Sequence, residues 1–400
     1  MRKLTLIALI VIIGLTFGLM INAEEKKEEK GGGDVKLGGH MRMFLFDKAW
    51  GTSTVAGKEY KHSALNNGVY GASHNLILFI SKDISENFSV EANPDFTMGS
   101  GGATPKLGKQ LGENRSASTG NAGTTVKFNQ WFAKYNLSAY KVQLRAGYIN
   151  ALFTQDYGKE LFWHEQMVGT KFICNSDTSA WHDSGIEAYR SFEVGDISLP
   201  VYMYILNGAG GQSYGDNNNN KSIMVHAEPE FSGALAGLKT SVSYGFGDYG
   251  DEKWNLSTMT ATVKADMKNN KYSRWALGAS YALQQFNFRF EYAGSNYDKY
   301  YNFGTAKEEA KGTYGYALKV FYKVIPDKLT AMVHYDYVKA ESSATVRDEY
   351  KTTVLAMQYE LEPGSTLIAE LDNADWSNDK KPKADELKFN RFVIGMRVTF

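Results

Sequence analysis

The last twelve residues of the chain show a strict two-residue alternation of side-chain character. One set of alternate positions is apolar and ends on an aromatic ring: Phe392, Ile394, Met396, Val398 and Phe400. The positions between them include Arg391 and Arg397. Because successive side chains of a β-strand point to opposite faces, this segment predicts a strand with one apolar and one charged face. Such a strand suits a water-soluble sandwich, where the apolar face covers a core, or a membrane barrel, where it faces lipid.

The same alternation recurs through residues 34–400 in segments of strand length. In the clearest hairpin, over 273–293, Asn287, Arg289 and Glu291 share one face and aromatic rings occupy the other. The chain holds 25 Tyr, 22 Phe and 39 Gly, a composition typical of membrane barrels with aromatic girdles at both interfaces. Its mean hydropathy of −0.37 excludes a bundle of membrane helices. It does not exclude a barrel, because only half of each strand must be apolar.

Short and long connections alternate between the predicted strands. The short ones are turns at 195–196, 325–327 and 362–364. The long ones are polar: 51–70, 99–124, 150–183, 208–220, 295–313 and 377–388. A soluble sandwich has no reason to gather its short links at one end, whereas outer-membrane barrels have short periplasmic turns and long external loops. Since a sheet in lipid cannot leave an open edge, the fold class we predict is all-β: a closed transmembrane antiparallel β-barrel of sixteen strands.

Two segments complicate this prediction. Residues 259–265 also alternate, but one extra strand would put long loops on the periplasmic side. We therefore place 248–272 in an external loop that can extend beyond the membrane as a β-ribbon. Eighteen strands, with a further strand within 155–183, is the alternative. Arg190 shares its parity with apolar neighbours on a predicted lipid face, which a bulge or a position near the membrane interface would explain.

Residues 1–23 have the features of a secretory signal peptide. Arg2 and Lys3 precede an apolar run, and charged residues follow Ala23. An uncleaved membrane anchor is the alternative, because the run is longer than an ordinary signal core. Residues 24–33 are charged and Gly-rich, which predicts a disordered lead-in to a barrel over 34–400. Export without a later apolar run of helical length predicts the outer membrane of a Gram-negative bacterium.

The charges are balanced, with 44 Lys and Arg against 44 Asp and Glu. Without residues 1–23 the count is 42 against 44, so electrostatics give no reason to expect nucleic-acid binding. The lone Cys174 excludes an intramolecular disulfide. The seven His have no metal-ligand spacing, and we predict no metal, no cofactor and no catalytic residue.

These features together resemble the Gram-negative outer-membrane porins of the sixteen-stranded general or phosphate-selective kind. The resemblance rests on the leader, a first strand around 37–46, a long third external loop, the segment 204–231 and the strand ending in Phe400. It implies a homotrimer surrounded by outer-membrane lipid, with the third loop, about 150–183, folded into the barrel. It also implies an assembly signal, read by the barrel-assembly machinery, formed by Phe392, Ile394, Met396, Val398 and Phe400.

The predicted polar faces nominate pore-lining residues: His40, Arg42, Glu91, Arg145, Arg289, Lys319, Arg391 and Arg397. The first and last strands become neighbours on closure, so the basic residues at the two ends of the chain should share a wall. The third loop supplies candidate constriction residues: Asp156, Glu160, His164 and Glu165. Folded inwards, they would face the basic wall and create a transverse field that orients polar solutes. The alternative is that these charges only solvate the lumen and pair with one another.

The sequence therefore predicts a porin without enzymatic activity, for passive diffusion of small hydrophilic solutes or ions. Two other functions stay open: an outer-membrane enzyme of the phospholipase or deacylase kind, and a plugged structural or adhesive barrel.

Overall fold

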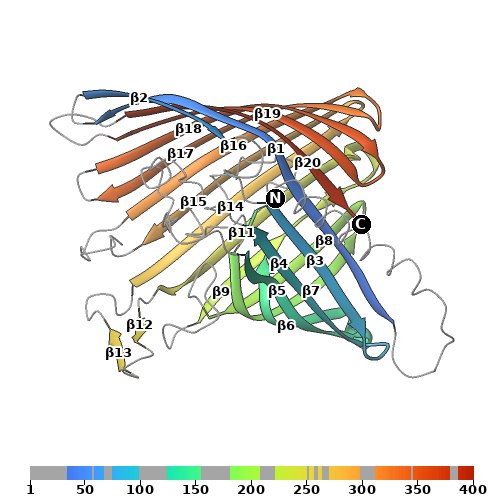
Figure 1. The fold of residues 1–400 in the computed structure, drawn as a ribbon. Coiled ribbons are helices and arrows are strands. Elements are labelled where there is room, and N and C mark those ends of the chain that lie inside the picture. Colours follow the sequence, from blue (N-terminus) through green and yellow to red (C-terminus); the bar gives the residue numbers. More distant parts are fainter. Residues whose placement is uncertain are drawn as a thin grey trace.

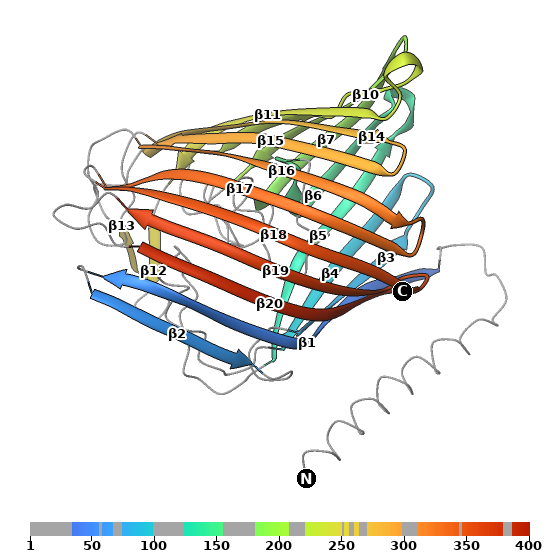
Figure 2. The same ribbon diagram turned by 90° about the horizontal axis from the view of Figure 1, so that it is seen from above.

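The computed structural model describes residues 34–55, 58–66, 74–98, 124–154, 181–207, 221–249, 252–255, 260–263, 270–297, 311–343, 346–378 and 386–400. These residues lie almost entirely in antiparallel strands that wrap into a barrel (Figures 1 and 2). The predicted signal peptide and lead-in lie outside the described residues. None of the helices in the described ranges is long and apolar enough to cross a membrane.

The strands of the first half are β1 (Val35–Val55), β2 (Lys58–Asn66), β3 (His74–Asp83), β4 (Phe88–Met98), β5 (Thr124–Leu137), β6 (Val142–Ala151), β7 (Trp181–Val194), β8 (Ile197–Leu206), β9 (Ser222–Ala227), β10 (Glu230–Phe231) and β11 (Leu238–Tyr249). Those of the second half are β12 (Glu252–Asn255), β13 (Thr260–Val263), β14 (Asn270–Leu283), β15 (Phe286–Tyr297), β16 (Lys311–Ile325), β17 (Leu329–Ser343), β18 (Val346–Glu362), β19 (Ser365–Asn378) and β20 (Glu386–Thr399).

The sheet closes on itself with sixteen strands around the barrel. Eighteen strands belong to one hydrogen-bonded sheet, and β20 pairs with β1 to close it. In two places, two short strands lie one after the other along the same neighbouring strand and together occupy one position in the barrel. β2 and β3 follow successive parts of β1, and β9 and β10 both lie between β8 and β11. Eighteen less two is sixteen, which confirms the predicted closed antiparallel barrel.

The connections differ from the prediction in one place. Residues 51–70 were expected to be a loop, and this was wrong for the part that the structure describes: β1 runs on to Val55 and pairs with β2 as a hairpin. Both faces of a strand that projects beyond the membrane are in water, so the backbone ladder continues without the apolar alternation that reveals a strand in the sequence. The predicted external ribbon is present as a separate two-stranded sheet of β12 and β13.

The outer face of the barrel is apolar and exposed. On β15, Phe288 and Phe290 are exposed, whereas Glu291, which follows Phe290 and points to the opposite face, is buried. Leu277 on β14 and Leu355 on β18 each keep 50% of their surface exposed. A water-soluble sheet would cover such residues, but in a bilayer they face hydrocarbon. We call the opposite face, towards the barrel interior, the inner wall.

The C-terminus is tied into the closing seam. The backbone of Phe400 exchanges two hydrogen bonds with Gly39, with N–O distances of 2.9 and 3.0 Å. A Cβ on Gly39 would lie 2.9 Å from Cζ of Phe400, so the ring covers the site that the glycine leaves empty. Next to it, Gly364 adopts a φ of +82° and its carbonyl accepts from the N–H of Thr399 at 2.7 Å. This turn needs glycine, because a Cβ there would lie 2.6 Å from the Thr399 oxygen.

Arg190 keeps its place on the outer face. The pairing of β7 with β6 and with β8 runs without a register shift, so the bulge that would have turned Arg190 inwards is absent from these strands. Its guanidinium carbon lies 4.7 Å from the centre of the Phe192 ring. The residue lies five positions before Gly195 and therefore towards the short-turn end of the barrel.

Candidate functional site

The inner wall carries a belt of ionisable side chains that are buried. Its members with less than about a twentieth of their surface exposed are Asp183, Glu187, His226, Arg274, Glu291, Lys319, His334, Asp336, Glu370, Asp372 and Arg391. Each lies opposite in parity to the exposed apolar residues of its strand, except that Ile325 follows an irregularity at the end of β16. Because charged groups are costly to bury without partners, a wall of both signs indicates mutual compensation within the interior.

On one side of the barrel, Arg145 and Glu187 join β6 to β7. The Nε of Arg145 donates to Oε1 of Glu187 at 2.6 Å, and its Nη2 donates to Oε2. Glu187 is almost fully buried, and the guanidinium lies 4.9 Å from the centre of the Phe132 ring. Two parallel N–H···O contacts of this kind fix both side chains. Nearby, Glu91 accepts hydrogen bonds from Gln130 at 2.9 Å and Asn93 at 3.1 Å, so its carboxylate is also held.

At the closing seam the register brings basic residues from the two ends of the chain together. Arg42 on β1 lies opposite Arg397 on β20, and His40 lies opposite Thr399. Arg391, further along β20, lies opposite Asp372 on β19. The seam therefore combines a basic stretch with a carboxylate at its edge.

A second basic group lies on β15, β16 and β17. Arg289 pairs in register with Lys319, which pairs in turn with His334. The guanidinium of Arg289 lies 4.7 Å from the centre of the Phe321 ring, and His334 Nε2 lies 2.9 Å from Asp336 Oδ1. All eight residues nominated from the sequence thus occupy inner-wall positions. Six lie in the two basic groups, Arg145 pairs with Glu187, and Glu91 is held by Gln130 and Asn93.

Part of the inner wall is covered. His226, His334 and Glu370 have no exposed surface, so protein atoms cover this part of the wall. A buried apolar cluster extends across the inner wall from Phe132 to Tyr350, and it includes small residues on successive strands: Ala276, Ala293 and Ala317. Apolar side chains therefore cover part of the inner wall between the charged groups.

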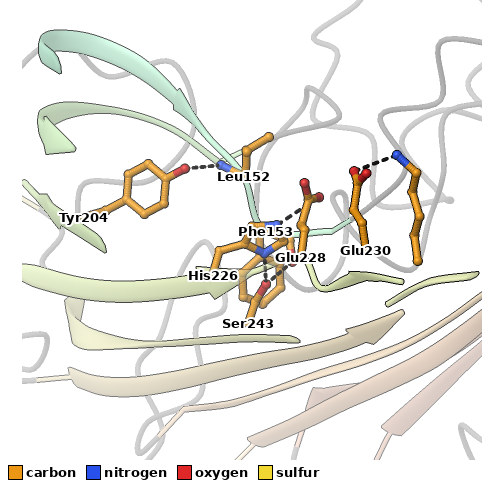
Figure 3. Close-up of polar contacts among 8 residues, drawn as sticks. Leu152, Phe153, Tyr204, His226, Glu228, Glu230 and Ser243 are labelled. Atoms are coloured by element: carbon orange, nitrogen blue, oxygen red, sulfur yellow. Dashed lines mark hydrogen bonds and ion pairs between the residues drawn. The ribbon is translucent and has the colours of Figure 1, made fainter. Parts of the chain in front are cut away.

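The chain after β6 turns onto the inner wall. The N–H of Leu152 donates to the Tyr204 hydroxyl on β8 at 3.2 Å (Figure 3). Phe153 is 2% exposed and belongs to the buried apolar cluster. Thr154, the last residue described before β7, is also buried. The start of the third loop therefore contacts strands that are not its neighbours in the barrel. The predicted constriction residues Asp156, Glu160, His164 and Glu165 lie outside the described residues.

The backbone oxygen of Phe153 is held by Ser243, with His226 and Glu228 behind it. We call Glu228, His226, Ser243 and the Phe153 carbonyl the loop anchor (Figure 3). The Ser243 hydroxyl donates to the Phe153 oxygen at 2.6 Å. His226 Nδ1 lies 2.6 Å from the same hydroxyl, and its Nε2 lies 3.0 Å from Glu228 Oε1. His226 and Glu228 reach the same side because they are two positions apart on an extended chain.

This order of groups resembles the acid, base and nucleophile of a hydrolase, but the hydrogen bonds oppose that chemistry. Ser243 has one proton, and it is committed to the Phe153 carbonyl. His226 must therefore donate from Nδ1 and cannot accept the serine proton, as a general base must. Ser243 and His226 are also buried, with 2% and 0% exposure. In this arrangement the three side chains fasten a loop.

The sequence reasoning missed Glu187, Arg274, His226 and Ser243. The first three alternate with apolar neighbours, so parity alone could have nominated them for the inner wall. Ser243 could not be found in this way, because a small hydroxyl residue carries no pattern that distinguishes an anchor from an ordinary strand position. Within the described ranges, no group of three or more His, Cys, Asp or Glu could hold a metal ion.

A closed sixteen-stranded barrel with an apolar outer face and a charged inner wall is the architecture of the outer-membrane β-barrel proteins of Gram-negative bacteria. Comparison with solved structures gives outer-membrane channels and porins. The outer membrane channel DcaP of Acinetobacter baumannii matches with a TM-score of 0.58 at 11% identity, over 94% of this chain and 99% of DcaP. An anion-selective porin from Comamonas acidovorans matches with 0.55 at 12%, over 92% and 99% of the two chains.

The trimer form of OmpT, an outer membrane protein of Vibrio cholerae, matches with a TM-score of 0.53 at 12% identity, over 92% of this chain and 99% of that one. No family model and no curated protein matches the sequence. At identities this low, the similarity establishes a shared fold: the barrel is that of the outer-membrane porins.

Proposed function

We propose that the protein is a porin that lets small hydrophilic solutes or ions diffuse passively across the outer membrane. The observation that carries the proposal is the inner wall, where basic and acidic side chains from most strands face inwards in a closed barrel. Barrels of this size enclose a space that side chains of the wall cannot fill alone, and charged walls suit water and ions. The buried cluster near Phe153 supports a narrow passage.

In this proposal the third loop, about 150–183, folds into the lumen and forms the constriction. The contacts of Leu152 with Tyr204 and of Phe153 with Ser243 support it, since both lie on the inner wall. The eight nominated residues line the passage, and the loop residues Asp156, Glu160, His164 and Glu165 face them across it. Residues 1–23 direct export, and the strand that ends in Phe400 serves as the signal for barrel assembly.

The protein acts without a cofactor and without enzymatic activity in this proposal. The hydroxyl of Ser243 donates away from His226, which supports an anchoring role over a hydrolytic one. We also propose a homotrimer in the membrane, as in the trimer form of the Vibrio cholerae neighbour.

Reconstitution into planar bilayers tests the proposal. We expect stepwise single-channel currents from the purified mature protein, and swelling of liposomes in small sugars but not in large ones. Bilayers that stay silent, with barrels shown to be folded by their altered migration in unheated gels, would support a plugged barrel instead. Release of fatty acid from lipid vesicles would support the enzyme. Cross-linking in detergent should give a band of three chains.

A further inference from the structure

We propose that Ser243 and His226 act as positioning residues that hold the base of the third loop in one place and thereby fix the cross-section of the passage. The inference rests on the proposed channel function and adds to it the residues that set the pore. Its basis is the loop anchor. There Ser243 on β11, which His226 on β9 contacts, binds the carbonyl of Phe153, 90 positions before Ser243 in the chain.

The direction of the hydrogen bonds makes the anchor a chain of dependent contacts. Ser243 donates its only proton to the Phe153 oxygen, so its own oxygen is left to accept from His226 Nδ1. The other ring nitrogen then faces the Glu228 carboxylate at 3.0 Å. The ring nitrogen Nδ1 orients the hydroxyl, and the hydroxyl holds the loop. The carboxylate lies close to the other ring nitrogen without forming a hydrogen bond to it. Loss of the Ser243 hydroxyl therefore releases the Phe153 carbonyl, and loss of the His226 ring leaves the hydroxyl without its second partner.

Burial makes these contacts strong. Phe153, Ser243 and His226 are each no more than 2% exposed, so water cannot replace a lost partner. A buried donor or acceptor left without a partner is costly, and the site therefore favours a single arrangement. The surroundings support the same orientation: the Tyr202 ring lies 5.8 Å from the His226 ring, and the Leu152 N–H contacts Tyr204 next to it.

The anchor acts on backbone, which sets it apart from ordinary packing of Phe153 in the apolar cluster. Apolar contacts of the Phe153 ring are not directional and allow the ring to shift against its neighbours. A hydrogen bond to the carbonyl is directional and fixes the position of the main chain at one point. The residues after Phe153 continue into the third loop. Ser243 therefore fixes the main chain at the last residues described before the third loop.

The test compares Ser243→Ala with Ser241→Ala. Ser241 lies on the same strand, faces the same way and is also buried, which makes it a matched control. Ser243→Thr keeps the hydroxyl and should behave like the wild type. His226→Ala should reproduce Ser243→Ala, and the double variant should add little, because both substitutions remove the same chain of contacts. Folding of every variant is checked by migration in unheated gels.

Two readouts separate anchoring from conduction. The first uses a Thr154→Cys probe with Cys174→Ser, since Thr154 is 3% exposed and the natural thiol must be removed. We expect maleimide to label this thiol about 5- to 30-fold faster in Ser243→Ala, the factor that the loss of one buried contact produces in a local opening equilibrium. The second readout is the distribution of single-channel conductances, which should broaden in Ser243→Ala and stay narrow in Ser241→Ala.

Faster labelling together with a broadened distribution supports the proposal. Unchanged labelling in Ser243→Ala overturns it. Faster labelling in channels whose conductance stays as in the wild type overturns the link between the anchor and the passage. A wild-type protein that never conducts refutes the proposed channel, and faster labelling would then still show that Ser243 holds the loop.

Discussion

Arg42 on β1 lies directly opposite Arg397 on β20, at the seam where the two ends of the chain meet. Residues 355 positions apart in sequence thus form one basic stretch of the inner wall. Two like charges in register are repulsive, and natural sheets avoid them unless neighbours compensate. In the proposed channel, this positive stretch would attract anions at close range.

We expect the double substitution of Arg42 and Arg397 by Ala to shift the reversal potential under a KCl gradient towards cation preference. Removal of two positive charges from the wall weakens the attraction for anions at close range. Thr366→Ala, an uncharged change at the position on β19 that pairs with Arg397, serves as the control. A reversal potential that does not move would exclude the pair from the residues that set selectivity.

Arg145→Ala should destabilise the barrel more than the removal of both partners. The single change leaves the Glu187 carboxylate buried without its guanidinium, which typically costs about 3–5 kcal/mol. The double variant Arg145→Met with Glu187→Leu removes both charges and should recover most of that loss. The free energy of unfolding, from urea titration in lipid vesicles, measures both. Equal losses in the single and double variants would show that the pair contributes packing only.

Gly39→Ala should disturb the seam. The new Cβ would lie 2.5 Å from the Ile77 carbonyl oxygen and 2.9 Å from the Phe400 ring, and a backbone atom cannot give way cheaply. Overpacking of this kind typically costs about 1–3 kcal/mol. Gly312→Ala is the control, because its Cβ would meet only Asn296 Oδ1 at 3.5 Å. The yield of folded protein in vesicles should fall for the first variant and hold for the second.

Arg190→Leu reports where the membrane lies on β7. We expect a gain of about 0–1 kcal/mol in the free energy of unfolding in vesicles, the value for a cation near the interface of a barrel. A cation at the bilayer midplane would give a gain of about 2–4 kcal/mol on replacement by Leu. A gain in that higher range would show that Arg190 is in the hydrocarbon, and that the short-turn end extends further from the membrane than we infer. Ser191→Ala, on the opposite face, should change little.

Much of the barrel was predictable because lipid imposes a simple local rule. Where one face meets hydrocarbon, as with Leu277 and Leu355, side chains must alternate, and the strands and their short turns follow. Beyond the membrane both faces of a strand meet water, so side chains need not alternate. For this reason the hairpin of β1 and β2 was predicted to be a loop. The third-loop residues could be nominated only as a group, since their function depends on which wall they meet.

The sequence by itself determined the strands that cross the membrane, the face that each of their side chains takes and the need for closure, since these depend on a two-residue period and on the cost of an open edge in lipid. Only the tertiary structure decided which side chains become neighbours. The register of β1 with β20 places Arg42 opposite Arg397, and the pairing of β6 with β7 brings Arg145 to Glu187. Contacts such as Ser243 with Phe153 depend on the path of a chain across the barrel interior, and no local pattern encodes that path.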